Sequence, residues 1–117
     1  MKYETDRFIC QIHNGIAHVC FKSAEVVEYS EAVQIGAELR RMIGTHDFNR
    51  LVIDFEALRF ITSTVLEALV SVYLRCKKLG RQLRVVHADP LIRETLRTTQ
   101  LDRIIPVMDT LDDALEQ

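Results

Sequence analysis

The stretch from Leu51 to Leu69 constrains the fold most, because its hydrophobic period changes once along its length. Residues 51–55 read Leu-Val-Ile-Asp-Phe, an apolar run with one carboxylate that is typical of a strand covered on both faces. After it, apolar residues recur at helical spacing and predict one buried stripe, formed by Leu66, Leu69, Val70, Tyr73 and Cys76. The chain is therefore expected to pass from a central strand into a long helix.

Three consecutive hydroxyl residues, Thr62, Ser63 and Thr64, lie where the two periods meet. The start of a helix leaves backbone N–H groups unpaired, so hydroxyl side chains fit there for structural reasons alone. Thr64 and Glu67 have the spacing of a capping box. On that interpretation Thr64 caps the helix, and Thr62 and Ser63 are turn residues.

Length and charge narrow the class of protein. The 117 residues are typical of a single domain, so one domain over residues 1–117 is expected. With 15 basic and 17 acidic side chains, the formal charge of -2 gives no basic footprint for nucleic acid or anionic membrane. No apolar run approaches ~18 residues, and the N-terminus does not resemble a signal peptide. We expect a cytoplasmic protein that does not insert into membranes.

An Asn14-Gly15 pair between two apolar-rich runs predicts a hairpin near the N-terminus. A two-residue loop would pair His13 with Ile16 and create one apolar face, made of Phe8, Cys10, Ile12, Ala17, Val19 and Phe21. Cys10 and Cys20 would then point to opposite sides of the hairpin. Together with Cys76, they are expected to be unpaired thiols.

The remaining elements follow from local signals. Residues 22–29 show no clear pattern. A helix is predicted to begin with Ser30 as its N-cap and to end at Gly44, and another strand is predicted over residues 83–87. Strand, helix and strand with short joints imply a right-handed parallel crossover. The fold class is thus α/β, with helices packed on a single mixed sheet of about four to five strands, an antiparallel hairpin followed by parallel crossovers.

Further helices are predicted toward the C-terminus. Asp89-Pro90 suits the first positions of a helix, whose apolar side would contain Leu91, Ile92, Thr95 and Leu96. Pro106 confines its short apolar run to the edge or end of a strand. Residues 110–116 predict a last short helix with acidic residues in its first turn.

Catalytic and metal-binding signatures are weak. The four histidines, at positions 13, 18, 46 and 87, show no ligand spacing, and the cysteines form no CxxC motif. No nucleophile elbow surrounds Ser63, and four glycines form no phosphate loop. We therefore expect no enzyme activity, no metal and no cofactor. The cluster of Lys77, Lys78, Arg81 and Arg84 is interpreted as a solvated helix end, with a basic docking patch as the alternative.

Four segments, taken in order, resemble the STAS domain of bacterial anti-sigma-factor antagonists and of some transporters. Residues 51–55 resemble its central strand, and residues 60–69 resemble the loop that enters its following helix. Residues 77–86 resemble the end of that helix and the next strand, and residues 96–107 resemble a Leu-x-x-Thr-Gly-Leu segment. The sequence differs from the usual family pattern at Thr62, where aspartate is common, at Val65, where a small residue is common, and at Gln100, where glycine is common.

The resemblance implies a switch and a docking surface. Ser63 occupies the position that a partner kinase phosphorylates, with Thr62 and Thr64 as alternative acceptors, and Arg59 as a candidate counter-charge. The residues expected to meet the partner are Arg59, Thr62, Ser63, Thr64, Glu67, Thr99 and Gln100. Capping alone explains hydroxyls at this position as well as phosphorylation does, and docking without phosphorylation is a further alternative.

The resemblance also names classes of partner. The first is an anti-sigma factor that is a serine kinase of the GHKL type, which a non-catalytic antagonist would capture until it is phosphorylated. The second is the ATPase of a membrane lipid or solute transporter, on which a STAS subunit would dock. A third hypothesis for the function, which does not rest on the resemblance, is a small ligand-binding protein or a thiol enzyme.

Overall fold

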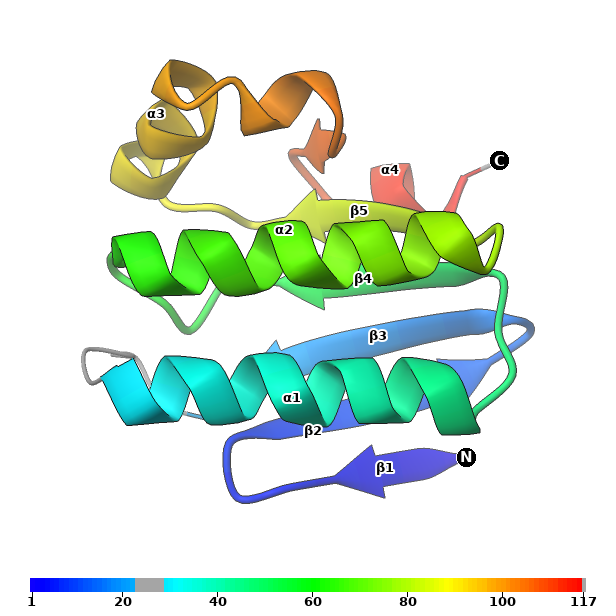
Figure 1. Ribbon diagram of the computed structural model, residues 1–117. Coiled ribbons are helices and arrows are strands. Elements are labelled where there is room, and N and C mark those ends of the chain that lie inside the picture. The colour runs from blue at the N-terminus through cyan, green and yellow to red at the C-terminus, as the bar shows by residue number, and fades with distance from the viewer. Residues whose placement is uncertain (23–28, 117) are drawn as a thin grey trace.

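The computed structural model describes residues 1–22 and 29–116. Six strands form one mixed sheet whose spatial order follows the sequence: β1 (Lys2–Glu4), β2 (Phe8–His13), β3 (Ile16–Phe21), β4 (Arg50–Asp54), β5 (Gln82–Val86) and β6 (Val107–Met108). The helices are α1 (Tyr29–Thr45), α2 (Ser63–Lys78), α3 (Pro90–Thr98), the 3-10 helix η1 (Leu101–Arg103) and α4 (Leu111–Leu115) (Figure 1).

The predicted α/β class and mixed sheet are confirmed, with six strands in place of four to five. The strand that the sequence did not predict is β1, whose 3 residues are too few to show a hydrophobic period, while the 2-residue β6 forms the opposite edge of the sheet. β1, β2 and β3 pair antiparallel, and β3 to β6 pair parallel. Pro106 precedes the edge strand β6, as expected.

The hairpin register is confirmed, since His13 pairs with Ile16 and Cys10 pairs with Val19. Asn14 and Gly15 both have positive φ, 52° and 78°. Two consecutive positive φ angles match the twist of the flanking strands, which explains the Asn-Gly pair at this turn.

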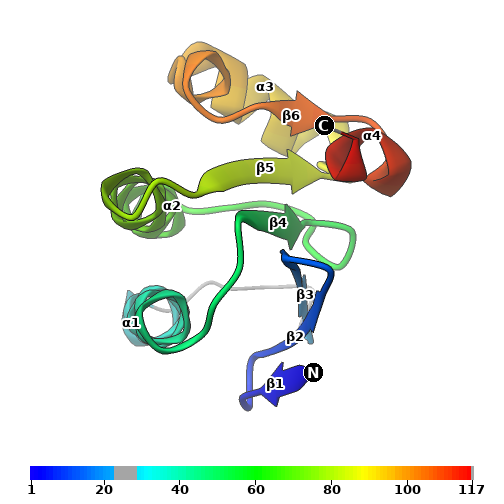
Figure 2. The same cartoon turned by 90° about the vertical axis from the view of Figure 1, so that its right-hand side faces the viewer.

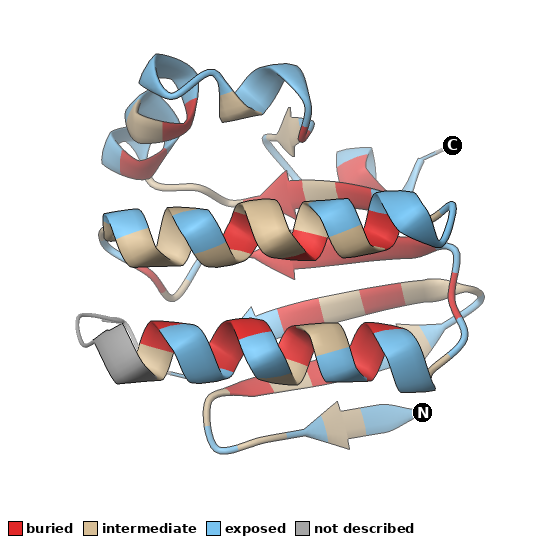
Figure 3. Ribbon diagram, viewed as in Figure 1, coloured by how far each residue is buried: buried red, intermediate tan, exposed pale blue. Residues whose placement is uncertain are grey.

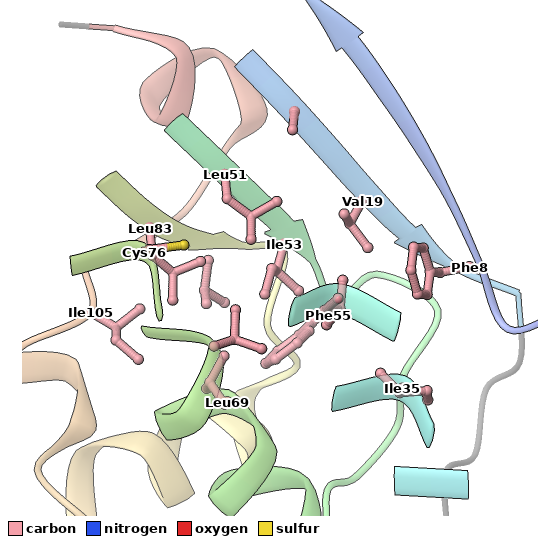
Figure 4. Close-up of a cluster of buried hydrophobic side chains, with 14 of the residues drawn as sticks. Phe8, Val19, Ile35, Leu51, Ile53, Phe55, Leu69, Cys76, Leu83 and Ile105 are labelled. Carbon is pink, nitrogen blue, oxygen red and sulfur yellow. The ribbon is translucent and has the colours of Figure 1, made fainter. Parts of the chain in front are cut away.

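Helices cover both faces of the sheet. Figure 2 shows α1 and α2 on one side and α4 on the other. Between α1, α2 and the sheet lies the main core, to which Phe8, Val19, Leu51, Ile53 and Leu69 contribute (Figure 4). A smaller cluster under α4 contains Val52, Val86 and Ala114. All five residues of β4 are buried because it lies between these two layers (Figure 3).

Several predicted boundaries were wrong. α1 begins at Tyr29, so Ser30 lies inside it, and the helix continues past Gly44 to Thr45. Gly44 does not have the positive φ typical of a glycine that ends a helix, and Thr45 Oγ1 donates to the Arg41 carbonyl 2.8 Å away. Residues 23–28, part of the segment without a clear sequence pattern, lie outside the described residues.

The start of α3 is confirmed, since the Asp89 carboxylate accepts from the Leu91 N–H at 2.9 Å. Its buried side consists of Ile92 and Leu96, whereas Leu91 is 62% exposed, contrary to the predicted apolar side. Within the described part of the chain, no helix is both long and apolar enough to span a membrane.

Candidate functional site

The start of α2 is capped by Thr62. Its Oγ1 accepts a hydrogen bond from the Val65 N–H at 3.3 Å, and its carbonyl accepts from the Leu66 N–H at 3.1 Å. The predicted capping box centred on Thr64 is therefore wrong, because Thr64 already lies in the first turn. The extended backbone of Thr62, with φ -93° and ψ 168°, places its hydroxyl over the free N–H groups.

Ser63 is the first residue of α2 and is exposed. Its hydroxyl makes no hydrogen bond with any residue that the structure describes. Thr62 and Thr64 are both half-buried. The first turn of α2 carries no acidic residue, so the positive end of the helix dipole is not neutralised there. Ser63 is thus the accessible hydroxyl of the three.

Two shallow hollows flank α2, with Glu67 on the ridge between them. The first, of about 180 Å³, lies toward α1 and includes Thr64 and Ser71 in its lining. The second, of about 360 Å³, is apolar and is lined by Leu66, Glu67, Val70, Thr99 and Leu101. The structure thereby places the predicted docking residues Thr64, Glu67 and Thr99 around one helix. Arg59 and Gln100 are exposed but line neither hollow.

A polar cluster that the sequence did not predict surrounds Asp54, at the end of β4. The Asp54 side chain is 6% exposed and lies 3.0 Å from His18 Nε2 and 3.1 Å from His87 Nδ1. The Glu56 N–H also donates to it, at 2.9 Å. Burial by itself raises the pKa of Asp54, but the hydrogen bonds from Glu56, His18 and His87 outweigh it and hold the pKa below its ordinary value.

These groups are distant in the sequence, because β3, β4 and the residue after β5 supply one each. Cys20 pairs in register with Asp54, and His18 lies two residues earlier on the same face. In the hairpin register, His18 and Cys20 alternate with Ala17 and Val19 and therefore lie on the face opposite the apolar one. The sequence did not show that β4, which carries Asp54, would lie beside the strand with His18 and Cys20.

Two of the four residues in the expected basic cluster have structural roles. Arg81 donates to the Ile43 carbonyl at 2.6 Å and stacks on Phe48, with 4.4 Å between guanidinium carbon and ring centroid. Arg84 donates to the Ala114 carbonyl at 3.0 Å. Lys77 and Lys78 are exposed in the last turn of α2, as expected for a solvated helix end.

The prediction of unpaired thiols is confirmed, since Cys10, Cys20 and Cys76 are all free. Burial raises the pKa of Cys10 to about 12 and that of Cys76 to about 11, which leaves both thiols protonated and unreactive. Cys20 is exposed, but partial burial and the charges of Asp54 and Glu56 also raise its pKa.

Comparison with known families gives a match to the STAS domain over residues 8–114. The chain belongs to the STAS domain family. An anti-sigma-factor antagonist from Mycobacterium paratuberculosis is 29% identical, with a TM-score of 0.79 over 92% of this chain and 89% of that one. A putative anti-sigma-factor antagonist from Thermotoga maritima is 17% identical, with a TM-score of 0.83 over 92% and 91% of the two chains.

A third similar structure is the Bacillus cell fate determinant SpoIIAA in its phosphorylated form, 15% identical, with a TM-score of 0.70 over 92% of this chain and 96% of that one. No curated protein matches. These similarities confirm the STAS fold that the four sequence segments implied.

The structure gives physical reasons for two departures from the usual STAS pattern. Thr62 replaces an aspartate, and both side chains place an oxygen where an N-cap needs an acceptor. Val65 replaces a small residue, and here its side chain is partly buried against the main core. For Gln100, which replaces a glycine, the backbone keeps a left-handed conformation with φ 63°.

Proposed function

We propose that this STAS domain is a non-catalytic anti-sigma-factor antagonist that binds a partner serine kinase of the GHKL type and is controlled by phosphorylation of Ser63. One observation carries the proposal: among the three hydroxyls at the start of α2, Ser63 is exposed while Thr62 caps the helix and Thr64 is half-buried. Among the similar structures are an anti-sigma-factor antagonist and a putative one, which supports this class of partner.

The site favours a phosphate on Ser63. The N–H groups of Ser63 and Thr64 have no carbonyl of the helix to bond, because the first turn lacks preceding residues. A phosphate of charge near -2 would meet these donors and the positive end of the helix dipole. Glu67, one turn further, opposes it only weakly because its carboxylate is exposed to solvent.

The effect of the phosphate would therefore fall on the partner complex. A charge at a helix start changes the free energy of unfolding by only about 0.3–1 kcal/mol. An unpaired charge that must lose its water against a docking protein costs several kcal/mol. The docking surface would comprise Ser63, Thr64, Glu67 and Thr99. The mostly apolar hollow beside Leu66 and Leu101, with the charged Glu67 in its lining, supplies area that a partner can bury.

Capture of partners from the native cytoplasm tests this proposal, with wild type, Ser63→Ala and Ser63→Asp as baits. We expect wild type and Ser63→Ala to retain a serine kinase and Ser63→Asp to lose it, with all three melting within a few degrees of one another. Gln11→Glu adds one charge at an exposed position of β2 and should bind as wild type does. Incubation with the kinase should add one phosphate, located at Ser63 by fragment mass measurement.

Three outcomes would contradict it. Capture of a transporter ATPase by all three baits would replace the kinase with the alternative partner. Phosphate on Thr62 or Thr64 would move the acceptor. Loss of capture with Gln11→Glu would show that total charge, and not the start of α2, controls binding.

A further inference from the structure

The cluster around Asp54 contains a set of metal-binding side chains. His18, Cys20 and Asp54 each offer one ligand atom, and these atoms lie within 4.8 Å of one another. They lie at the carboxyl ends of β3 and β4, on the sheet face opposite α1 and α2. Residues 55–62 connect this edge of the sheet to the start of α2 (Figure 1).

The two oxygens of Asp54 have different surroundings. Oδ1 accepts from the Glu56 N–H at 2.9 Å and faces His87 Nδ1 at 3.1 Å. Oδ2 faces His18 Nε2 at 3.0 Å, and the same nitrogen lies 3.5 Å from Cys20 Sγ. Protein donors thus fix one oxygen, while the other faces an imidazole nitrogen and a thiol, both suited to a metal ion.

We propose that His18 Nε2, Cys20 Sγ and Asp54 Oδ2 bind one Zn²⁺ ion. Tetrahedral zinc, with bonds of about 2.0–2.3 Å to nitrogen, oxygen and sulfur, separates neighbouring ligand atoms by about 3.2–3.6 Å. The distances of 3.0 Å and 3.5 Å already present here need only small side-chain movements. Neither distance requires a backbone shift.

A fourth ligand has space beside these three. A hollow of about 240 Å³ is lined by Cys20, Phe21, Asp54, Glu56 and Ala57, and it can admit a water molecule or the Glu56 carboxylate. Zn²⁺ takes the place of the proton on His18 Nε2, so the neutral imidazole then carries its proton on Nδ1, and Cys20 binds as a thiolate whose proton is released to solvent. The negative charges of Asp54 and Glu56 favour a divalent cation at this place.

His87 acts as a positioning residue. It holds Asp54 Oδ1 and thereby turns Oδ2 toward His18. Its backbone has φ 57°, in the left-handed region that residues other than glycine uncommonly adopt, although asparagine, aspartate and histidine are found there more often than other side chains. A ligating carboxylate is commonly held in this way by a second hydrogen bond, whose loss weakens metal binding by about 10–100-fold.

Titration of the purified full chain with Zn²⁺, and with Co²⁺ as an optical probe, tests the site without any partner protein. We expect one ion per chain, a cobalt spectrum of four-coordinate type with a thiolate charge-transfer band, and a higher melting temperature with zinc. Cys20→Ser, His18→Ala and Asp54→Asn should weaken binding by more than about 100-fold. His13→Ala, an exposed histidine of the same hairpin, should bind as wild type does.

Two further variants separate positioning from folding. His87→Ala should weaken Zn²⁺ binding by about 10–100-fold, and His87→Asn should restore most of it, because asparagine tolerates positive φ and offers an amide donor. Cys20→Ser changes an exposed side chain and should leave the fold intact even if Asp54→Asn unfolds.

A six-coordinate cobalt spectrum without a thiolate band, or an equal loss with His13→Ala, would overturn the proposal. Ser63→Asp should keep the metal affinity of wild type, so the zinc site and the phosphorylation proposal can fail separately.

Discussion

At Gln100 a single residue adopts a backbone conformation that its side chain disfavours. Its φ of 63° is left-handed, its side chain makes no capping hydrogen bond, and the residue is exposed. Non-glycine residues lose roughly 1–2 kcal/mol in this region relative to right-handed helical geometry. Resemblance to the STAS pattern gave the position of the missing glycine, but the sequence alone could not show that the turn would keep its shape without it.

We therefore expect Gln100→Gly to raise the free energy of unfolding by about 1 kcal/mol, the relief of strain exceeding the greater entropy of glycine in the unfolded chain. Urea denaturation measures the change. Thr98→Gly, two residues earlier within α3, should lower stability instead. Equal effects of both substitutions would show that the left-handed turn stores no strain.

At the scale of elements, the most extensive helix–helix contact within the described part of the chain is that of α1 with α2. A Cβ atom built at Gly36 would lie 3.2 Å from Ala68 Cβ and 3.1 Å from Arg40 Nη1. Arg40 Nη1 also donates to Ser71 Oγ at 3.0 Å across the same contact. The small residue therefore sets how near the two helices approach, which also fixes the hollow beside Thr64.

Gly36→Leu should lower the free energy of unfolding by about 1–3 kcal/mol, since the larger side chain must separate the helices. Gly44→Leu is the matched control, because there the nearest atom is the flexible end of Arg75 and leucine fits at little cost. Thermal unfolding compares the two. A stable Gly36→Leu variant would mean that the helices tolerate a wider spacing.

Element boundaries show where sequence reasoning succeeded and failed. The hairpin register was predictable residue by residue, because a two-residue turn and one apolar face leave a single alignment. The buried strand β4 was predictable from its apolar run, which a single carboxylate interrupts. The cap of α2 was not, since three adjacent hydroxyls fit the same rule and only the extended backbone of Thr62 decides among them.

At the scale of the whole molecule, hydrogen bonds from Arg50 hold α4 against the sheet. Its guanidinium, in a residue only 8% exposed, donates to the carbonyls of Ala114 and Glu116 at 3.1 Å and 2.9 Å, and to Gln82 at 2.9 Å. Burial and the neighbouring Arg84 lower the pKa of Arg50. These bonds keep the last helix over Val52 and Val86, which would otherwise face solvent.

Arg50→Ala should cost about 1–3 kcal/mol of stability, because its charge-assisted hydrogen bonds are lost and, of the two arginines, only Arg84 then donates to the carbonyls of Ala114 and Glu116. Hydrogen exchange should show faster exchange in α4 first. Arg103→Ala, at an exposed position, should change neither quantity. Unchanged exchange in α4 of the Arg50 variant would show that apolar contacts alone hold the helix.

The Asp54 cluster was beyond sequence reasoning for a reason that belongs to the whole molecule. His18, Asp54 and His87 are separated by more than thirty residues at each step and meet only because β3, β4 and β5 are neighbours. Local spacing rules for metal ligands describe motifs within one segment, whereas of the proposed ligands only His18 and Cys20 share a strand and Asp54 comes from the neighbouring one.

The strand order β1 to β6 repeats the order in which a ribosome would deliver the strands. The strand with which each new strand pairs has already been synthesised. The sheet can therefore extend at one edge during synthesis, before later segments are made. While the edge strand is unpaired, its free backbone N–H and C=O groups could pair with strands of other nascent chains. In the folded protein this edge is β6, which has 2 residues and is preceded by Pro106. It therefore offers few free backbone groups with which a strand of another chain could pair.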